Sequence, residues 1–219
     1  MRQIFLKKDK KESTMPKKTI RYVAVGDSYT YGEGAEHDEA WPVLLVEHLR
    51  KNGVDIELVL NPAVSGWATG QAIEFELPEL REAKPDFATV MLGANDIAQG
   101  APLGAFREQY AHVLDEIQSV LRDKKNIVAI TIPDFSATPA GKDIGEEMDA
   151  QPLIAAFNKA IKEEAAKRNL DVADVYPASR EMESNKAQVS EDGLHPSAAG
   201  YKRWEGVIYP VVYAKLRSR

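Results

Sequence analysis

Three side chains that together could attack a carbonyl group follow predicted β-strands in this sequence. Ser28 stands in GDS, directly after the apolar run IRYVAV, and His195 and Asp192 stand in DGLHP, three residues apart. A serine hydroxyl is a poor nucleophile until a neighbouring base removes its proton. A histidine base in turn needs a carboxylate that holds its ring in one tautomer. These types and spacings make Ser28 a candidate nucleophile, His195 a candidate base and Asp192 its orienting acid.

The same attack would create an oxyanion, which requires hydrogen-bond donors that are already in place. Gly66 can offer a backbone N–H that no side chain obstructs, and Asn95 can offer its side-chain amide. The backbone N–H of Ser28, close to the start of a predicted helix, is a third donor. We therefore predict an oxyanion hole formed by Ser28, Gly66 and Asn95.

Each of these residues also has a simpler interpretation. A serine that follows a strand is more often a helix N-cap than a nucleophile, and we interpret Asp27 as a turn or cap residue only. Gly66 is typical of backbone that needs a positive φ, Asn95 is typical of turns, and His195 could cap the helix after it. Only the convergence of these residues at one place favours a catalytic role over a structural one.

Strand and helix patterns alternate five times along the chain, which predicts the elements that bring these residues together. We expect strands over residues 20–25, 54–61, 86–93, 126–132 and 170–175. We expect helices over residues 41–53, 68–84 (split or kinked at Pro78), 102–123, 152–168 and from Pro196 onward. This alternation predicts an α/β fold, a three-layer α/β/α sandwich with a five-stranded parallel sheet.

In such a sheet, ligands bind outside the carboxyl ends of the strands. The polar clusters GDS, NPAVSGWATG, GAND and DGLHPSAAG all follow predicted strands, so they should meet at one rim. Residues 133–151 and 176–195 show no clear periodicity, and we expect long irregular loops there. Loops of this length are commonly functional, and the first, which contains Phe135, Ile144 and Met148, should border the pocket.

Composition limits the remaining possibilities. The chain has 219 residues and no cysteine, which excludes disulfides, thiolate nucleophiles and cysteine-ligated metal sites. Residues 1–21 hold eight lysines and arginines against two acids, whereas the remainder is strongly acidic. An acidic body argues against a nucleic-acid partner. We expect residues 1–18 to be a basic, flexible extension and residues 19–219 to be a single domain.

The N-terminal segment does not fit a secretory signal peptide. Its apolar core is only Ile4-Phe5-Leu6, followed at once by lysines, whereas a signal peptide needs about 7–15 apolar residues. No run approaches the roughly 18 apolar residues of a membrane span. We therefore expect a cytoplasmic protein without stable membrane insertion, while secretion and a start at Met15 stay open.

The four motifs, in this order and at these separations, resemble those of the SGNH hydrolases, also called the GDSL lipase/esterase family. The matching blocks are GDS at 26–28, NPAVSG at 61–66, GAND at 93–96 and DGLHP at 192–196. The resemblance implies a flavodoxin-like three-layer fold. It implies Ser28 as nucleophile, His195 as general base and then acid, Asp192 as its orienter, and Ser28, Gly66 and Asn95 as oxyanion donors. The family commonly has leucine after the serine, but this sequence has Tyr29, which we expect to alter the pocket edge.

The resemblance implies a serine carboxylic-ester hydrolase that acts through an acyl-enzyme on a small-molecule ester, without metal or organic cofactor. The mixed composition of residues 133–151 favours short acyl groups. An acyltransferase, a lysophospholipase or thioesterase, and a non-catalytic interaction domain stay open as alternatives. A nucleotide-binding flavodoxin-like module is disfavoured, because residues 26–34 lack both the G-x-G-x-x-G spacing and a phosphate-loop ending. The acyl chain length and the oligomeric state stay open as well.

Overall fold

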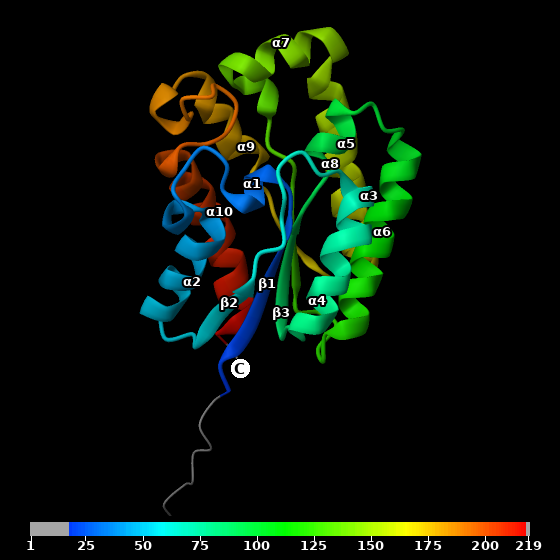
Figure 1. The fold of residues 1–219 in the computed structure, drawn as a ribbon, viewed down its shortest axis with the longest axis vertical. Coiled ribbons are helices and arrows are strands. Elements are labelled where there is room, and N and C mark those ends of the chain that lie inside the picture. The colour runs from blue at the N-terminus through cyan, green and yellow to red at the C-terminus, as the bar shows by residue number, and fades with distance from the viewer. Residues whose placement is uncertain (1–17, 218–219) are drawn as a thin grey trace, which may run out of the picture.

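Five parallel strands form the centre of the computed structural model, which describes residues 18–217 apart from the side chains of residues 145–147 (Figure 1). The strands are β1 (Ile20–Gly26), β2 (Ile56–Leu60), β3 (Phe87–Met91), β4 (Ile127–Ile130) and β5 (Asp171–Ala173). Their order in the sheet is β2-β1-β3-β4-β5, and every neighbouring pair is parallel. The predicted five-stranded parallel sheet is confirmed. The predicted N-terminal extension lies outside the described residues, except for Lys18.

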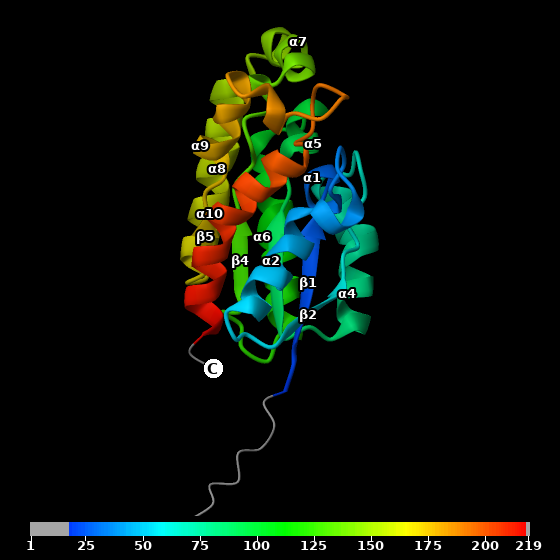
Figure 2. The ribbon, with the colours of Figure 1, turned by 90° about the vertical axis from the view of Figure 1, so that its left-hand side faces the viewer.

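Helices cover both faces of this sheet. They are α1 (Ser28–Tyr31), α2 (Trp41–Lys51), α3 (Thr69–Gln71), α4 (Leu77–Ala83), α5 (Ala94–Ala98), α6 (Leu103–Val120), α7 (Pro139–Met148), α8 (Ala150–Lys167), α9 (Tyr176–Ser179) and α10 (Ala198–Leu216). Helices α2 and α10 pack together on one face, and α4, α6 and α8 cover the other (Figures 1 and 2). Helices on both faces of one sheet confirm the predicted three-layer sandwich.

Among residues 18–217, no helix combines the length and the apolar character needed to cross a membrane.

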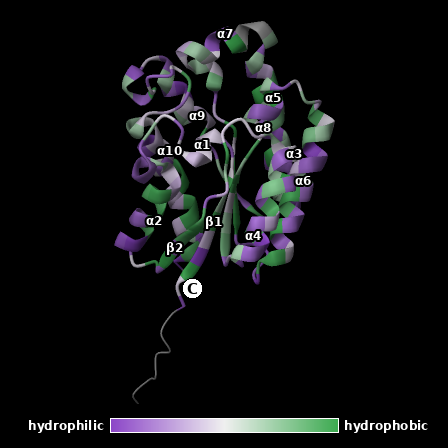
Figure 3. Cartoon of the chain, viewed as in Figure 1, coloured by the Kyte–Doolittle hydropathy of each residue, from purple (hydrophilic) through white to green (hydrophobic). Residues whose placement is uncertain are grey.

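The burial of the strands explains why their sequences are so uniformly apolar. Every residue of β3 and β4 is buried, whereas the edge strands β2 and β5 keep partly exposed positions. A parallel sheet with helices on both faces has no solvent-facing side, so its central strands are continuous hydrophobic runs. Figure 3 shows this contrast, with apolar strands inside and hydrophilic patches along the outer helices.

Some boundaries differ from the predictions. Residues 133–151 are not an irregular loop, because they contain a 3-10 turn at Phe135–Ala137 and the helix α7. Glycines within this segment weaken its helical signal, while Pro139 at the first helical position is compatible with a helix start. Residues 176–195 likewise hold α9 and two 3-10 turns, Arg180–Glu183 and Lys186–Gln188. The last helix begins at Ala198 rather than at Pro196, with Ser197 as its N-cap.

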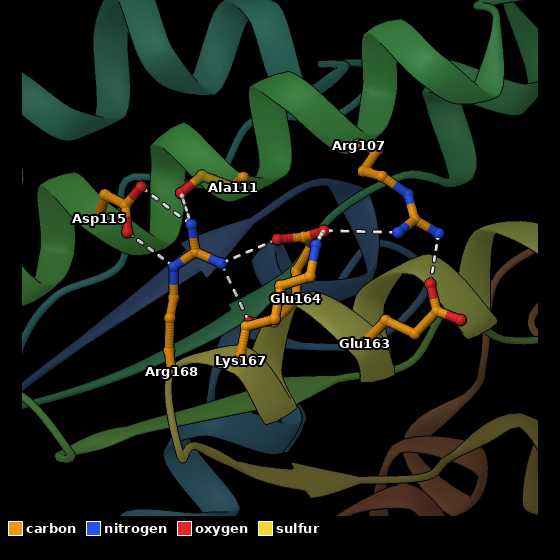
Figure 4. A network of polar contacts seen from close by, with 7 residues as sticks. All are labelled: Arg107, Ala111, Asp115, Glu163, Glu164, Lys167 and Arg168. Atoms are coloured by element: carbon orange, nitrogen blue, oxygen red, sulfur yellow. Dashed lines mark hydrogen bonds and ion pairs between the residues drawn. The ribbon is translucent and has the colours of Figure 1, made fainter.

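An ion-pair network joins α8 to α6 on the outer face of the sandwich (Figure 4). Arg168 donates to both carboxylate oxygens of Asp115, at 2.6 and 2.9 Å, and to Glu164 at 2.9 Å. The side chain of Glu164 is only 5% exposed and also accepts from Lys167 at 2.7 Å. Although burial opposes its ionisation, the bonds from Lys167 and Arg168 hold the pKa of Glu164 below its usual value. This network fixes the C-terminal half of α8 on α6.

Candidate active site

The predicted site residues lie where the strand order changes direction. From β1 the chain proceeds to β2 on one side, and β3 lies on the other side, with Gly26 paired to Met91 at the ends of β1 and β3. Ser28 follows β1 and Asn95 follows β3, so both stand at this switch point, where ligands bind in open parallel sheets. Helices α1, α5 and α7 lie at this same end of the molecule (Figures 1 and 2).

Ser28, His195 and Asp192 form one hydrogen-bonded line. The Nε2 atom of His195 lies 3.0 Å from the Oγ atom of Ser28, and its Nδ1 atom lies 2.7 Å from the Oδ2 atom of Asp192. A carboxylate can only accept at Nδ1, so the proton of a neutral ring is on Nδ1 and Nε2 is free to accept from the serine hydroxyl. The structure thus brings together the three side chains that the sequence analysis selected.

Asp192 is held by more than the histidine ring. Its Oδ1 atom accepts from the hydroxyl of Ser190 at 2.7 Å and from the backbone N–H groups of Leu194 and His195 at 2.7 and 2.9 Å. Partial burial opposes the charge, but these bonds and the bond from His195 bring the pKa of Asp192 well below its usual range. The carboxylate therefore stays ionised at neutral pH. Ser190 escaped the sequence analysis because a serine two residues before an aspartate is a common turn pattern.

The helix cap and the candidate nucleophile are two different residues. Asp27 is the N-cap of α1, and its carboxylate accepts from the backbone N–H of Tyr29 at 3.1 Å, which confirms its interpretation as a cap. Ser28 is the first residue of the helix, so its side chain is available to His195. Burial raises the pKa of Asp27 to about 7, and the nearby Asp96 adds to this effect.

Asn95 is oriented by the loop that contains Gly66. Its Nδ2 atom donates to the carbonyl of Trp67 at 3.0 Å, which leaves its second N–H for another acceptor. Gly66 has a φ of +83°, as predicted, and its carbonyl accepts from the side chain of Gln99 at 3.0 Å. The loop that carries Gly66 and the helix that carries Asn95 are thus joined at two places beside the site.

A small cavity of about 70 Å³ opens in front of Ser28. Its lining residues come from the segments that follow β1, β3, β4 and β5. They are Ser28, Tyr29, Ala94, Asn95, Ala98, Phe135, Ile144, Leu194 and His195. Ser28, Asn95 and His195 therefore share one cavity, with Asp192 behind the histidine; Gly66 is not among its lining residues. Phe135 and Ile144 confirm that the segment 133–151 borders this pocket.

The sequence analysis missed Glu76, which supports the turn before Ser28. Its side chain is fully buried, and its Oε2 atom accepts from the backbone N–H of Gly26 at 3.0 Å. Burial raises its pKa to about 8, although the bond from Gly26 works in the other direction. Nothing in the sequence distinguishes Glu76 from Glu74 and Glu79, because all three belong to one predicted amphipathic helix and only packing decides which one is buried.

Comparison with known proteins adds independent evidence on the family. The model of the GDSL-like lipase/acylhydrolase family matches residues 24–203. The chain belongs to this family of ester hydrolases. The resemblance to the SGNH or GDSL hydrolases is therefore confirmed.

Relatives of this GDSL-family protein carry esterase and lipase names. It is 35% identical to an arylesterase of Vibrio mimicus over 83 residues, which are 37% of this chain and 40% of that protein. It is 22% identical to the spore germination lipase LipC of Bacillus licheniformis over 91% of this chain and all of that protein. The chain thus spans less than half of the arylesterase, and the full length of the more distant lipase.

Solved structures of the family share the fold. A lipase/acylhydrolase from Enterococcus faecalis superposes with a TM-score of 0.72 and 25% identity, over 90% of this chain and 97% of that one. The acetyl xylan esterase AlAXEase gives a TM-score of 0.70 at 18% identity, over 88% of this chain and all of that one. At the latter identity, the likeness concerns the fold alone.

Proposed function

We propose that this GDSL-family protein is a serine carboxylic-ester hydrolase that forms an acyl-enzyme on Ser28 and prefers short acyl groups. The observation that carries the proposal is the hydrogen-bonded line from Asp192 through His195 to Ser28, which opens into a cavity. A nucleophile bonded to a base, with that base bonded to an orienting acid, is the arrangement that activates a serine.

In the first half of the reaction, the Oγ atom of Ser28 attacks the ester carbonyl carbon while Nε2 of His195 takes the hydroxyl proton. The negative charge that develops on the carbonyl oxygen is stabilised by the N–H groups of Ser28 and Gly66 and by the amide of Asn95. His195 then gives its proton to the departing alkoxide, so that the C–O bond breaks and an alcohol leaves. Ionised Asp192 stabilises the imidazolium that exists between these two proton transfers.

In the second half, a water molecule replaces the alcohol. His195 takes a proton from this water as it attacks the acyl carbon, and the same proton returns to Oγ of Ser28 when the acid leaves. The protein is thereby restored, and the reaction consumes one water for each ester.

The size of the cavity supports the preference for short acyl groups. A volume of about 70 Å³, lined on its apolar side by Phe135, Ile144 and Leu194, has room for an acyl group of roughly two to three carbons. Two proteins of similar sequence or fold are named an arylesterase and an acetyl xylan esterase. We propose an aryl, sugar or simple alcohol ester of a short acid as the substrate class.

Covalent labelling with a fluorophosphonate and hydrolysis of p-nitrophenyl acetate test the proposal together. The wild type should react in both assays and Ser28→Ala in neither. Near-normal turnover by Ser28→Ala would remove Ser28 from its role, and a wild type that resists labelling would favour a non-catalytic module. Product analysis with an added alcohol separates hydrolysis from acyl transfer.

A further inference from the structure

Tyr29, the residue after the proposed nucleophile, packs against the ring of the proposed base. The centroids of the Tyr29 and His195 rings are 5.4 Å apart, with an interplanar angle of 56°. Tyr29 also contacts Trp204 of α10, at 5.5 Å between centroids and an angle of 48°. The tyrosine ring thus contacts both the loop that carries His195 and the helix that follows it.

The backbone of Tyr29 is fixed on both sides, and its ring is held by the side chains packed around it. The N–H of Tyr29 donates to Asp27 at 3.1 Å, and its carbonyl accepts from Nε1 of Trp41 at 3.0 Å. Trp41 and Trp204 are both fully buried, and Tyr29 itself is only 5% exposed. A displacement of the ring would therefore disturb a close-packed region on each side.

The hydrogen bonds of His195 leave one rotation of its ring that the packing of Tyr29 can restrict. Both bonds are made at ring nitrogens, Nδ1 to Asp192 and Nε2 to Ser28, so they hold two atoms at the edge of the ring. Hydrogen bonds tolerate modest changes of angle, so they leave a small rotation of the ring about its Cβ–Cγ bond less restrained. A bulky neighbour in contact with the ring limits this rotation, and aromatic pairs favour defined tilts.

We propose that Tyr29 is a positioning residue for His195: its ring holds the imidazole plane in the orientation in which Nε2 meets the hydroxyl of Ser28. The inference rests on the proposed acyl-enzyme function and extends it to a residue at which this chain departs from the family's common leucine. Because Tyr29 is adjacent to Ser28 in the chain, one rigid segment sets both the nucleophile and the tilt of its base.

Substitution of the ring tests this role. We expect Tyr29→Leu to lower kcat for p-nitrophenyl acetate by about tenfold with KM changed less than about twofold, because orientation rather than binding is lost. The second-order rate of fluorophosphonate labelling should fall in parallel. Tyr29→Phe keeps the ring and should stay within about twofold of wild type in both assays. Tyr29→Met, with its adaptable side chain, replaces the leucine variant if that variant is unstable.

Tyr110→Leu is the matched control for the loss of a buried tyrosine ring. Tyr110 is fully buried on α6 against Phe106, and its hydroxyl has no partner in the described part of the chain. This variant should lower Tm but keep the kcat of the wild type while folded. An unchanged kcat in Tyr29→Leu, a change in KM alone, or a Tyr29→Phe as slow as Tyr29→Leu would each overturn the inference. Failure of the proposed function is recognised separately, by an unlabelled wild type or an active Ser28→Ala.

Discussion

The Nε2 atom of His195 lies 3.0 Å from the Oγ atom of Ser28, although 167 positions separate the two residues in the sequence. Ser28 stands at the end of β1, and His195 stands in the loop that follows β5 and precedes α10. Because all five strands are parallel, both segments leave the sheet at the same rim.

Asp192→Asn should lower kcat by about a thousandfold or more while the fold is kept. The side-chain amide of asparagine would donate to Nδ1 of His195, so the proton of the neutral ring would move to Nε2. A protonated Nε2 can no longer accept the hydroxyl proton of Ser28. Steady-state kinetics with p-nitrophenyl acetate and circular dichroism measure the two effects. Asp55→Asn, at the opposite end of the sheet beside Thr19, is the control. An unchanged rate in Asp192→Asn would mean that another carboxylate orients the base.

Asn95→Ala should reduce kcat by about a hundredfold or more and change KM little, because an oxyanion donor acts mainly in the transition state. The variant also loses the bond from Asn95 to the carbonyl of Trp67. Gln99→Ala loses a comparable bond to the same loop, at the carbonyl of Gly66, but no proposed donor. Its kcat should fall far less, and equal losses in the two variants would assign Asn95 a structural role only.

Ile144→Ala should shift the acyl preference toward longer chains. Ile144 on α7 lines the small cavity in front of Ser28, so its truncation makes room for additional methylene groups. We expect kcat/KM of the wild type to fall from acetate to butyrate esters, and the butyrate-to-acetate ratio to rise about tenfold in the variant. Leu153→Ala, which truncates a similarly exposed residue of α8, should leave the ratio unchanged. A wild type that prefers long chains would contradict the proposed substrate class.

Glu76→Gln should make stability less dependent on pH. Burial raises the pKa of Glu76 from its ordinary value of 4.5 to about 8, so the folded protein holds a proton that the unfolded chain releases near 4.5. The stabilisation is complete below about pH 4.5 and is lost progressively up to about pH 8, by at most about 1.4 kcal/mol per pH unit for one proton. Asp27, whose pKa is raised to about 7, adds to the same decline.

Urea unfolding at pH 5, 6, 7 and 8 measures this decline. Glutamine can still accept from the N–H of Gly26 but does not titrate, so the free energy of unfolding of Glu76→Gln should fall less over this range. Glu79→Gln, an exposed neighbour on α4, should keep the slope of the wild type. Parallel slopes in all three proteins would show that Glu76 carries no proton in the folded state at these pH values.

Much of the site was predictable because the topology of a parallel sheet can be inferred from the order of its strands and helices. Alternating strands and helices imply parallel strands, parallel strands place all their carboxyl ends at one rim, and polar residues after each strand must then converge there. Ser28, Asn95, Asp192 and His195 were therefore predictable as site residues from the sequence. The sequence also indicated that residues 133–151 border the pocket, although their helix was missed, because local propensity there is weak and the packing against η3 (Phe135–Ala137) and α8 decides.

The sequence by itself determined the order of the elements and the chemistry available at the rim, because periodicity and turn composition are local properties of the chain. Only the tertiary structure decided which acid is buried behind Gly26, that Ser190 supports Asp192, and how small the cavity before Ser28 is. It also decided that Tyr29 contacts His195. These features depend on side chains that are distant in sequence and meet only when the layers close, so their physical cause is long-range packing rather than any local pattern.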